Sequence, residues 1–294
     1  MHFTSEQRLE DGVLERAFTL GEIPGLLWTP ASVPASAAAP VPVPAAASVP
    51  VPAASSVPVP AASSVPAGAS APASPPVPLI LLGHPPLGLR RMYPRLVDRA
   101  RQCAAEGFAA ATIELPGSGD RPRWPAADQA RADLRRAIEA GEPVSDAIID
   151  ALVLPLVEKA VPEWQAALDA LLALPEIGGP VGYSGGVISI GIRLAVVEPR
   201  IAAAGLFAGS FVPRIMFEEA RQVTIPLHVL LQWDDEGNDR QAALDLFDAF
   251  GSTEKTLHAN MGGHTGVPRF AGDDAARFFA RHLVTPDRQA TSGR

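Results

Sequence analysis

One serine in the sequence lies in a setting that favours nucleophilic chemistry. The segment GYSGG at 182–186 matches G-x-S-x-G, a motif in which a strand turns sharply into a helix and exposes the serine hydroxyl. Glycines on both sides give such a turn room. The motif falls between a predicted strand at 179–186 and a predicted helix at 187–197, which is the context that it requires. We predict Ser184 as a nucleophile in a strained turn; the alternative is a glycine-rich turn with an N-cap serine.

A serine hydroxyl needs a base, and the base needs a partner that orients it. Where this motif carries catalysis, the partners follow in the order Ser, then Asp or Glu, then His. His264 lies in GGHTG, after the last predicted strand and before the last predicted helix, so we predict it as the general base. His258 falls inside a predicted strand and is expected to be packed there.

Two aspartates qualify as the orienting acid. Asp234 and Asp235 both follow the predicted strand at 226–232. A lone carboxylate at this place would be an ordinary solvated turn residue, but one of two next to a strand end can orient the histidine. We favour Asp235 and keep Asp234 as the alternative acid.

An acyl-transfer site also needs donors for the developing oxyanion. One is expected from the backbone N–H of Gly185, and the other from the loop after the first central strand. That loop reads GHPPLG at 83–88, and its two prolines have no N–H. The second donor is therefore predicted at Leu87, with Gly88 as the alternative.

These residues must be positioned by strands that alternate with helices. The predicted strands are 79–83, 108–115, 179–186, 201–209, 226–232 and 255–260, after a hairpin at 14–20 and 24–29. The predicted helices are 93–106, 187–197, 239–250 and 273–283, with a long helical stretch up to about 174. This alternation predicts an α/β fold with a mostly parallel central sheet and helices on both faces.

The composition restricts the class of protein. The chain has 294 residues and a formal charge of −8, which argues against a nucleic-acid partner because phosphate binding needs clustered basic residues. A single cysteine, Cys103, excludes an intramolecular disulfide and fits a reducing compartment. Neither a signal peptide nor a membrane span is visible, so a cytoplasmic protein is expected. No cofactor or metal is predicted, and the oligomeric state is left open.

Residues 31–77 differ from the rest of the chain. They consist almost entirely of Ala, Pro, Val and Ser, and VPVPAASS occurs at both 49–56 and 57–64. Such a density of proline disfavours helix and sheet, so we expect a disordered insertion in a single domain that spans 1–294. An expanded repeat without function and a ligand for a proline-recognition module are both compatible with it. The helical stretch 120–172 is a candidate cap over the site.

Taken together, the motifs GHPPLG, ELPGSGDRP, GYSGG, LLQWDDEGND and GGHTGVP resemble the α/β-hydrolase superfamily, and most of all bacterial serine esterases of the dienelactone-hydrolase-like branch. The resemblance implies an α/β-hydrolase fold and a carboxylesterase that cleaves small-molecule esters through an acyl-enzyme intermediate. It assigns the roles of nucleophile, base and acid to Ser184, His264 and Asp235.

The chain departs from that family in two ways. His84 is followed by two prolines where the family has His-Gly-Gly, and the nucleophile position carries serine where dienelactone hydrolases have cysteine. An amide or peptide hydrolase with the same triad is one alternative. A non-catalytic ligand-binding protein on the same scaffold is another.

Overall fold

The computed structural model describes residues 1–31, 75–209 and 211–284. Most of the predicted insertion at 31–77 therefore lies outside the described residues. The segments on either side of the gap at 32–74 contribute strands to the same sheet. No helix among the described residues is long and apolar enough to cross a bilayer.

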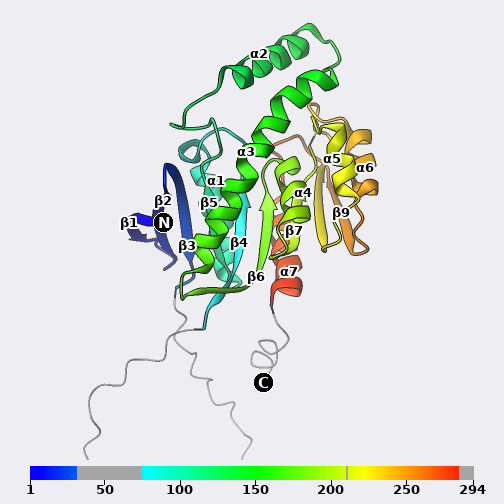
Figure 1. The fold of residues 1–294 in the computed structure, drawn as a ribbon. Helices are drawn as coiled ribbons and strands as arrows, with labels where there is room; N and C mark the ends of the chain where they lie inside the picture. Colours follow the sequence, from blue (N-terminus) through cyan, green and yellow to red (C-terminus); the bar gives the residue numbers. More distant parts are fainter. Residues whose placement is uncertain (32–74, 210, 285–294) are drawn as a thin grey trace, which may run out of the picture. The chain divides into compact units, whose positions relative to one another are not determined.

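One nine-stranded sheet organises the described chain, in the order β1-β2-β3-β5-β4-β6-β7-β8-β9 (Figure 1). The strands are β1 (His2–Arg8), β2 (Leu14–Leu20), β3 (Ile23–Thr29), β4 (Val77–Gly83), β5 (Ala109–Ile113), β6 (Ile177–Gly185), β7 (Ile201–Phe207), β8 (Leu227–Gln232) and β9 (Lys255–Asn260). The six strands from β5 to β9 in this order are parallel, whereas β1, β2 and β3 join antiparallel at the β5 side. The predicted mostly parallel sheet is confirmed.

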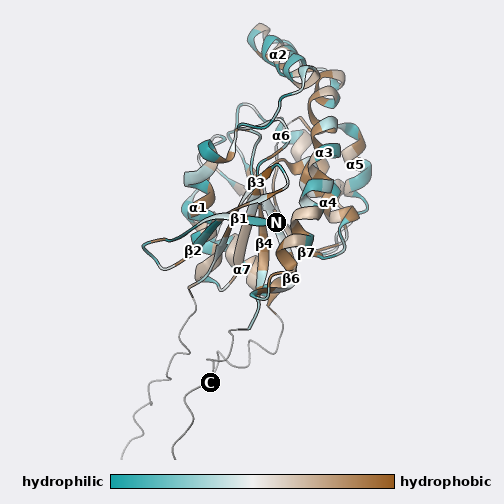
Figure 2. Cartoon of the chain, turned by 60° about the vertical axis from the view of Figure 1, so that its left-hand side comes forward, coloured by the Kyte–Doolittle hydropathy of each residue, from teal (hydrophilic) through white to brown (hydrophobic). Residues whose placement is uncertain are grey.

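Helices cover both faces of the sheet. They are α1 (Leu89–Ala105), α2 (Pro125–Ala140), α3 (Asp146–Leu172), α4 (Ile188–Val197), α5 (Arg214–Ala220), α6 (Arg240–Ala249) and α7 (Arg269–Leu283). Apolar residues of α1 and α7 pack on one face, and those of α3, α4, α5 and α6 on the other. In Figure 2 hydrophobic colour lies on the central strands and on α3 and α4, whereas hydrophilic colour is prominent on β1 and α2. This layering buries the parallel strands on both sides, which explains their continuous apolar runs.

The hairpin differs in detail from its prediction. Its turn lies at Gly21 and Glu22, and Pro24 and Gly25 belong to β3. Gly25 has no side chain because a Cβ there would collide with the Phe18 ring. The strand β1, which the sequence did not predict, extends the hairpin by one further strand. It is nearly all exposed, so it lacks the apolar alternation by which a strand is recognised.

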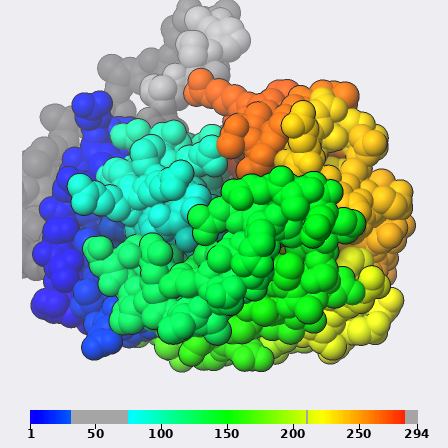
Figure 3. All heavy atoms as spheres, turned by 90° about the horizontal axis from the view of Figure 1, so that it is seen from above, coloured from blue at the N-terminus to red at the C-terminus, as the bar shows by residue number. Residues whose placement is uncertain are grey.

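The stretch 120–172 has two different parts. From Val153 onward α3 packs on the sheet, where Trp164 is buried edge-on against Tyr183. In contrast, α2 packs against α3 and lies above the strands in Figure 1. From above, the green residues of α2 and α3 form the front of the surface, beside the cyan residues that follow β4 (Figure 3). A cap over a bound substrate stays a prediction for α2 and the first turns of α3.

Candidate active site

The carboxyl ends of β8 and β9 bring a histidine and an aspartate into contact. His264 Nδ1 lies 2.7 Å from Asp235 Oδ2. The Asp235 side chain is only 6% exposed, whereas that of His264 is 68% exposed. With Nδ1 donating to the carboxylate, the other ring nitrogen, Nε2, is an acceptor that faces solvent. We call these two residues the His264 pair.

Local hydrogen bonds hold each member of the pair. Asp235 Oδ1 accepts from the N–H of Gly237, 3.1 Å away, which is a turn typical of aspartate after a strand. The buried Gln232 donates from Nε2 to the carbonyl of Gly263, 3.0 Å away, and so fixes the loop that carries His264. The sequence offered a signal for Gln232, because a polar residue follows the apolar run 229–231, but we did not assign it a role.

The neighbouring aspartate takes no part in this contact. Asp234 is exposed, and its backbone N–H donates to the carbonyl of Gly262, 3.2 Å away. Both candidates lie after the end of β8, where the Asp235 side chain is buried and that of Asp234 is exposed. Of the two predicted acids, the structure places Asp235 against His264.

Ser184 lies in a different environment from the one predicted. It belongs to β6 and pairs with Leu82 and Gly205 in the neighbouring strands. Among the described non-glycine residues only Phe211 has a positive φ. The left-handed positions of the strand-to-helix turn are Gly185 (φ 72°) and Gly186 (φ 78°). The prediction that Ser184 occupies the strained turn is therefore wrong, because the turn follows it in the sequence.

A half-buried arginine holds Ser184 in this position. Arg99 of α1 donates from Nη2 to the Ser184 carbonyl at 2.5 Å and to Ser184 Oγ at 3.1 Å. Its Nη1 donates to the Gly83 carbonyl at 2.8 Å. Burial lowers the pKa of the Arg99 guanidinium. We call Arg99, Gly83 and Ser184 the Arg99 anchor, which joins α1 to the ends of β4 and β6.

The anchor and the His264 pair are separate. No hydrogen bond joins Ser184 to His264, although the structure describes both residues. Ser184 Oγ lies beside Gly205 of β7, whereas the His264 ring stands edge-on to Phe207, with 5.6 Å between ring centroids. Gly205 and Phe207 are two residues apart, which corresponds to about 6–7 Å along a strand. The His264 ring therefore lies further toward the carboxyl end of the sheet than Ser184 Oγ.

The loop after β4 does not present the predicted oxyanion donor. The N–H of Leu87 donates to the carbonyl of Pro85 at 2.7 Å and is therefore already used. His84 is buried, and its ring nitrogens lie 2.8 Å from the Pro85 carbonyl and 2.9 Å from the Ile113 carbonyl. It fastens this loop to the end of β5. The backbone of Gly185, the other predicted donor, lies at the strand-to-helix turn with Arg99 close beneath it.

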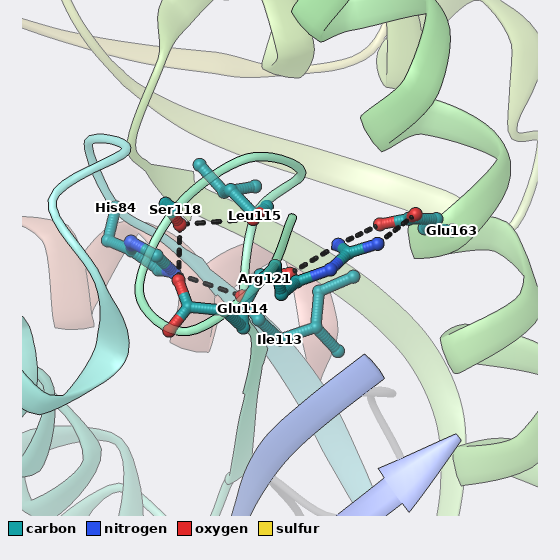
Figure 4. A network of polar contacts seen from close by, with 7 residues as sticks. All are labelled: His84, Ile113, Glu114, Leu115, Ser118, Arg121 and Glu163. Carbon is teal, nitrogen blue, oxygen red and sulfur yellow. Dashed lines mark hydrogen bonds and ion pairs between the residues drawn. The ribbon is translucent and has the colours of Figure 1, made fainter. Parts of the chain in front are cut away.

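A polar network orders the loop after β5 (Figure 4). The buried Glu114 accepts hydrogen bonds from Ser118 Oγ and from the backbone N–H of Leu89, the latter at 2.8 Å. Arg121 donates to the Glu114 carbonyl at 2.9 Å and to both carboxylate oxygens of Glu163 at 2.6 Å. This loop lines a cavity of about 900 Å³ together with residues of α3.

No residue of the His264 pair lines that cavity. Among the described residues, no group of three or more His, Cys, Asp or Glu side chains is arranged to hold a metal ion. The arrangement of the His264 pair is that of a base, His264, and a carboxylate that orients it, Asp235.

The sequence matches no protein-family model and none of the curated proteins. Among solved structures, a cold-adapted esterase from an Arctic intertidal metagenomic library superimposes with a TM-score of 0.64 at 24% identity, over 97% of this chain and 100% of that chain. The chain has the α/β-hydrolase fold.

Two further structures extend the likeness across this fold. Acetyl xylan esterase 1 from Thermoanaerobacterium gives a TM-score of 0.55 at 12% identity, over 95% of this chain and 87% of that chain. Dienelactone hydrolase from Anabaena variabilis gives 0.51 at 14% identity, over 95% of this chain and 99% of that chain. The α/β-hydrolase resemblance inferred from the motifs is confirmed at the level of fold.

Proposed function

We propose that this chain hydrolyses carboxylic esters of small molecules, with His264 as the general base and Asp235 as the group that orients it. The observation that carries the proposal is the 2.7 Å contact between His264 Nδ1 and Asp235 Oδ2. A buried carboxylate beside an exposed imidazole holds one tautomer and stabilises the imidazolium that forms during reaction. The structurally similar esterases support an ester as the substrate class.

The reaction follows from the hydrogen bonding of His264, whose Nδ1 is bound to Asp235 while Nε2 is an acceptor. Its Nε2 accepts a proton from the attacking group while the carbonyl carbon of the ester is attacked. The protonated ring then gives that proton to the leaving alkoxide, and Asp235 keeps the ring oriented throughout. The sequence predicts Ser184 as the attacking group, through an acyl-enzyme intermediate. In the structure that hydroxyl is bonded to Arg99, so the acyl-enzyme route stays a prediction.

One observation favours a second candidate, a ligand-binding protein without catalysis. Both the predicted nucleophile and the predicted oxyanion donor Leu87 are engaged in internal hydrogen bonds. Such a protein would retain the His264 pair without turnover. The esterase and the ligand-binding protein differ in whether substitution of His264 changes a rate of ester hydrolysis.

The test is hydrolysis of p-nitrophenyl acetate by the native chain and by His264→Ala. We expect the native chain to turn over and the variant to lose about 10²–10⁴-fold in kcat/KM, which is the usual contribution of a general base. Asp234→Asn is the matched control, because it changes an exposed carboxylate next to Asp235 without touching the pair. Equal rates in the native chain and His264→Ala would contradict the proposal.

A further inference from the structure

The strand-to-helix turn of this chain carries no nucleophilic side chain. After Ser184 the turn consists of Gly185, Gly186 and Val187, and α4 begins at Ile188. The backbone leaves no room for a larger residue at the second glycine. A Cβ on Gly186 would lie 2.7 Å from the backbone nitrogen of His84, and its φ of 78° is one that other residues rarely adopt.

Three further nucleophilic side chains among the described residues are occupied or at least half-buried. Ser118 is 3% exposed and donates to Glu114. Ser189 is 1% exposed and lies within α4. Cys103 is half-buried on α1, and its apolar surroundings raise the pKa of its thiol to about 12. A thiol with so high a pKa is protonated and unreactive at neutral pH.

Ser184 itself has the bonding pattern of a structural residue. Its hydroxyl and its carbonyl are both bound by one guanidinium, and a cation cannot accept the hydroxyl proton. Its side chain shares a sheet face with Gly182, where a Cβ would meet Phe279 and Leu283 of α7. The hydroxyl therefore points toward the layer formed by α1 and α7. It lies further from the carboxyl end of the sheet than the His264 ring does.

The base, in contrast, is open to solvent. The His264 side chain is 68% exposed, and its Nε2 has no partner among the described residues. Water can reach this nitrogen directly. Among the described residues no hydroxyl is hydrogen-bonded to His264, and an oriented base with solvent access is suited to deprotonating water.

We propose that water, and not Ser184, is the nucleophile in this site, and this inference rests on the ester hydrolysis proposed above. The oxygen of a water molecule forms a bond to the ester carbonyl carbon while His264 Nε2 takes one of its protons. The tetrahedral intermediate collapses by breaking the bond to the alcohol oxygen. The imidazolium gives its proton to that oxygen, so one ester and one water become one acid and one alcohol.

The experiment combines a covalent probe with a rate measurement on the full chain. A fluorophosphonate labels a serine that acts as a nucleophile, and mass spectrometry detects the adduct. We expect no adduct on the native chain and no initial burst of p-nitrophenol from p-nitrophenyl acetate. We expect Ser184→Ala to keep its rate within about threefold, while His264→Ala loses about 10²–10⁴-fold.

The possible outcomes distinguish failure of the water route from failure of the proposed ester hydrolysis. A stoichiometric fluorophosphonate adduct on any serine, or a burst equal to the enzyme concentration, overturns the water route and leaves ester hydrolysis standing. Absence of hydrolysis by the folded native chain, or equal rates with and without His264, overturns the function and the inference together. The probe is applied to the native chain, so the result does not depend on whether Ser184→Ala folds.

Discussion

The His264 pair and the Arg99 anchor lie at the same edge of one sheet and use their polar groups in opposite ways. In the pair, the buried Asp235 carboxylate holds Nδ1 of His264 and leaves the other ring nitrogen of this exposed side chain without a partner among the described residues. In the anchor, the donors of Arg99 point inward to Gly83 and Ser184. A residue of the right type therefore has reactive chemistry only where the fold leaves one of its atoms unbonded and accessible.

The largest expected effect comes from the carboxylate of the pair. We expect Asp235→Asn to lower kcat by about 10²–10⁴-fold, because an amide cannot hold the same tautomer or stabilise the imidazolium. Its free energy of unfolding should change far less than its rate. Ester hydrolysis and urea denaturation measure the two quantities, and an unchanged kcat would show that the pair has no catalytic part.

The anchor should show the reverse pattern. We expect Arg99→Ala to reduce the free energy of unfolding by about 2–4 kcal/mol, since it leaves buried carbonyl groups without donors and removes packing. The effect on kcat should be small once the protein is folded. Ser184→Ala, which removes a single acceptor, is the matched comparison in the same urea titrations. An arginine variant that is fully stable but inactive would place Arg99 in the reaction.

The network in Figure 4 extends the comparison to a third region. Glu114 accepts from the N–H of Leu89 at the start of α1, where the N-cap residue Gly88 has no side chain to do so. We expect Glu114→Ala to cost about 1–3 kcal/mol of unfolding free energy, because a buried donor is left unpaired. Glu22→Ala is a suitable control, as Glu22 is exposed beside the same cavity. Equal stability of the two variants would contradict this role.

The smallest effect concerns pH. Burial lowers the pKa of His228 to about 4, with a further contribution from neighbouring His258. Its folded-state pKa lies below the usual value near 6.5, so the unfolded chain binds more protons between these values. Stability should therefore fall as pH drops from about 6.5 to 4. We expect His228→Leu to lose several degrees less of Tm over this range than the native chain, and equal losses would contradict the assignment.

The sequence predicted the layered fold well because buried parallel strands are short apolar runs with helices between them. It also predicted the His264 pair, since a histidine and an aspartate after neighbouring strands meet at one edge. It did not predict the Arg99 anchor. A contact across 85 residues between Arg99 and Ser184 leaves no local pattern. The strained turn of the motif at 182–186 was also expected at Ser184, whereas the left-handed positions are Gly185 and Gly186, which only the backbone angles reveal.

The end of β3 and the start of β4 have a consequence for how this protein can evolve. Trp28 and Ile80 are both paired with Ala110, so the chain leaves after Thr29 and returns at Val77 on the amino side of the sheet. His264 and Asp235 follow strands on the carboxyl side. Lengthening a connection is thermodynamically cheap, at about 0.6 kcal/mol for each doubling. Copies of the octapeptide VPVPAASS can therefore be added or removed at little thermodynamic cost, in a connection that is joined to the sheet at the edge opposite to His264 and Asp235.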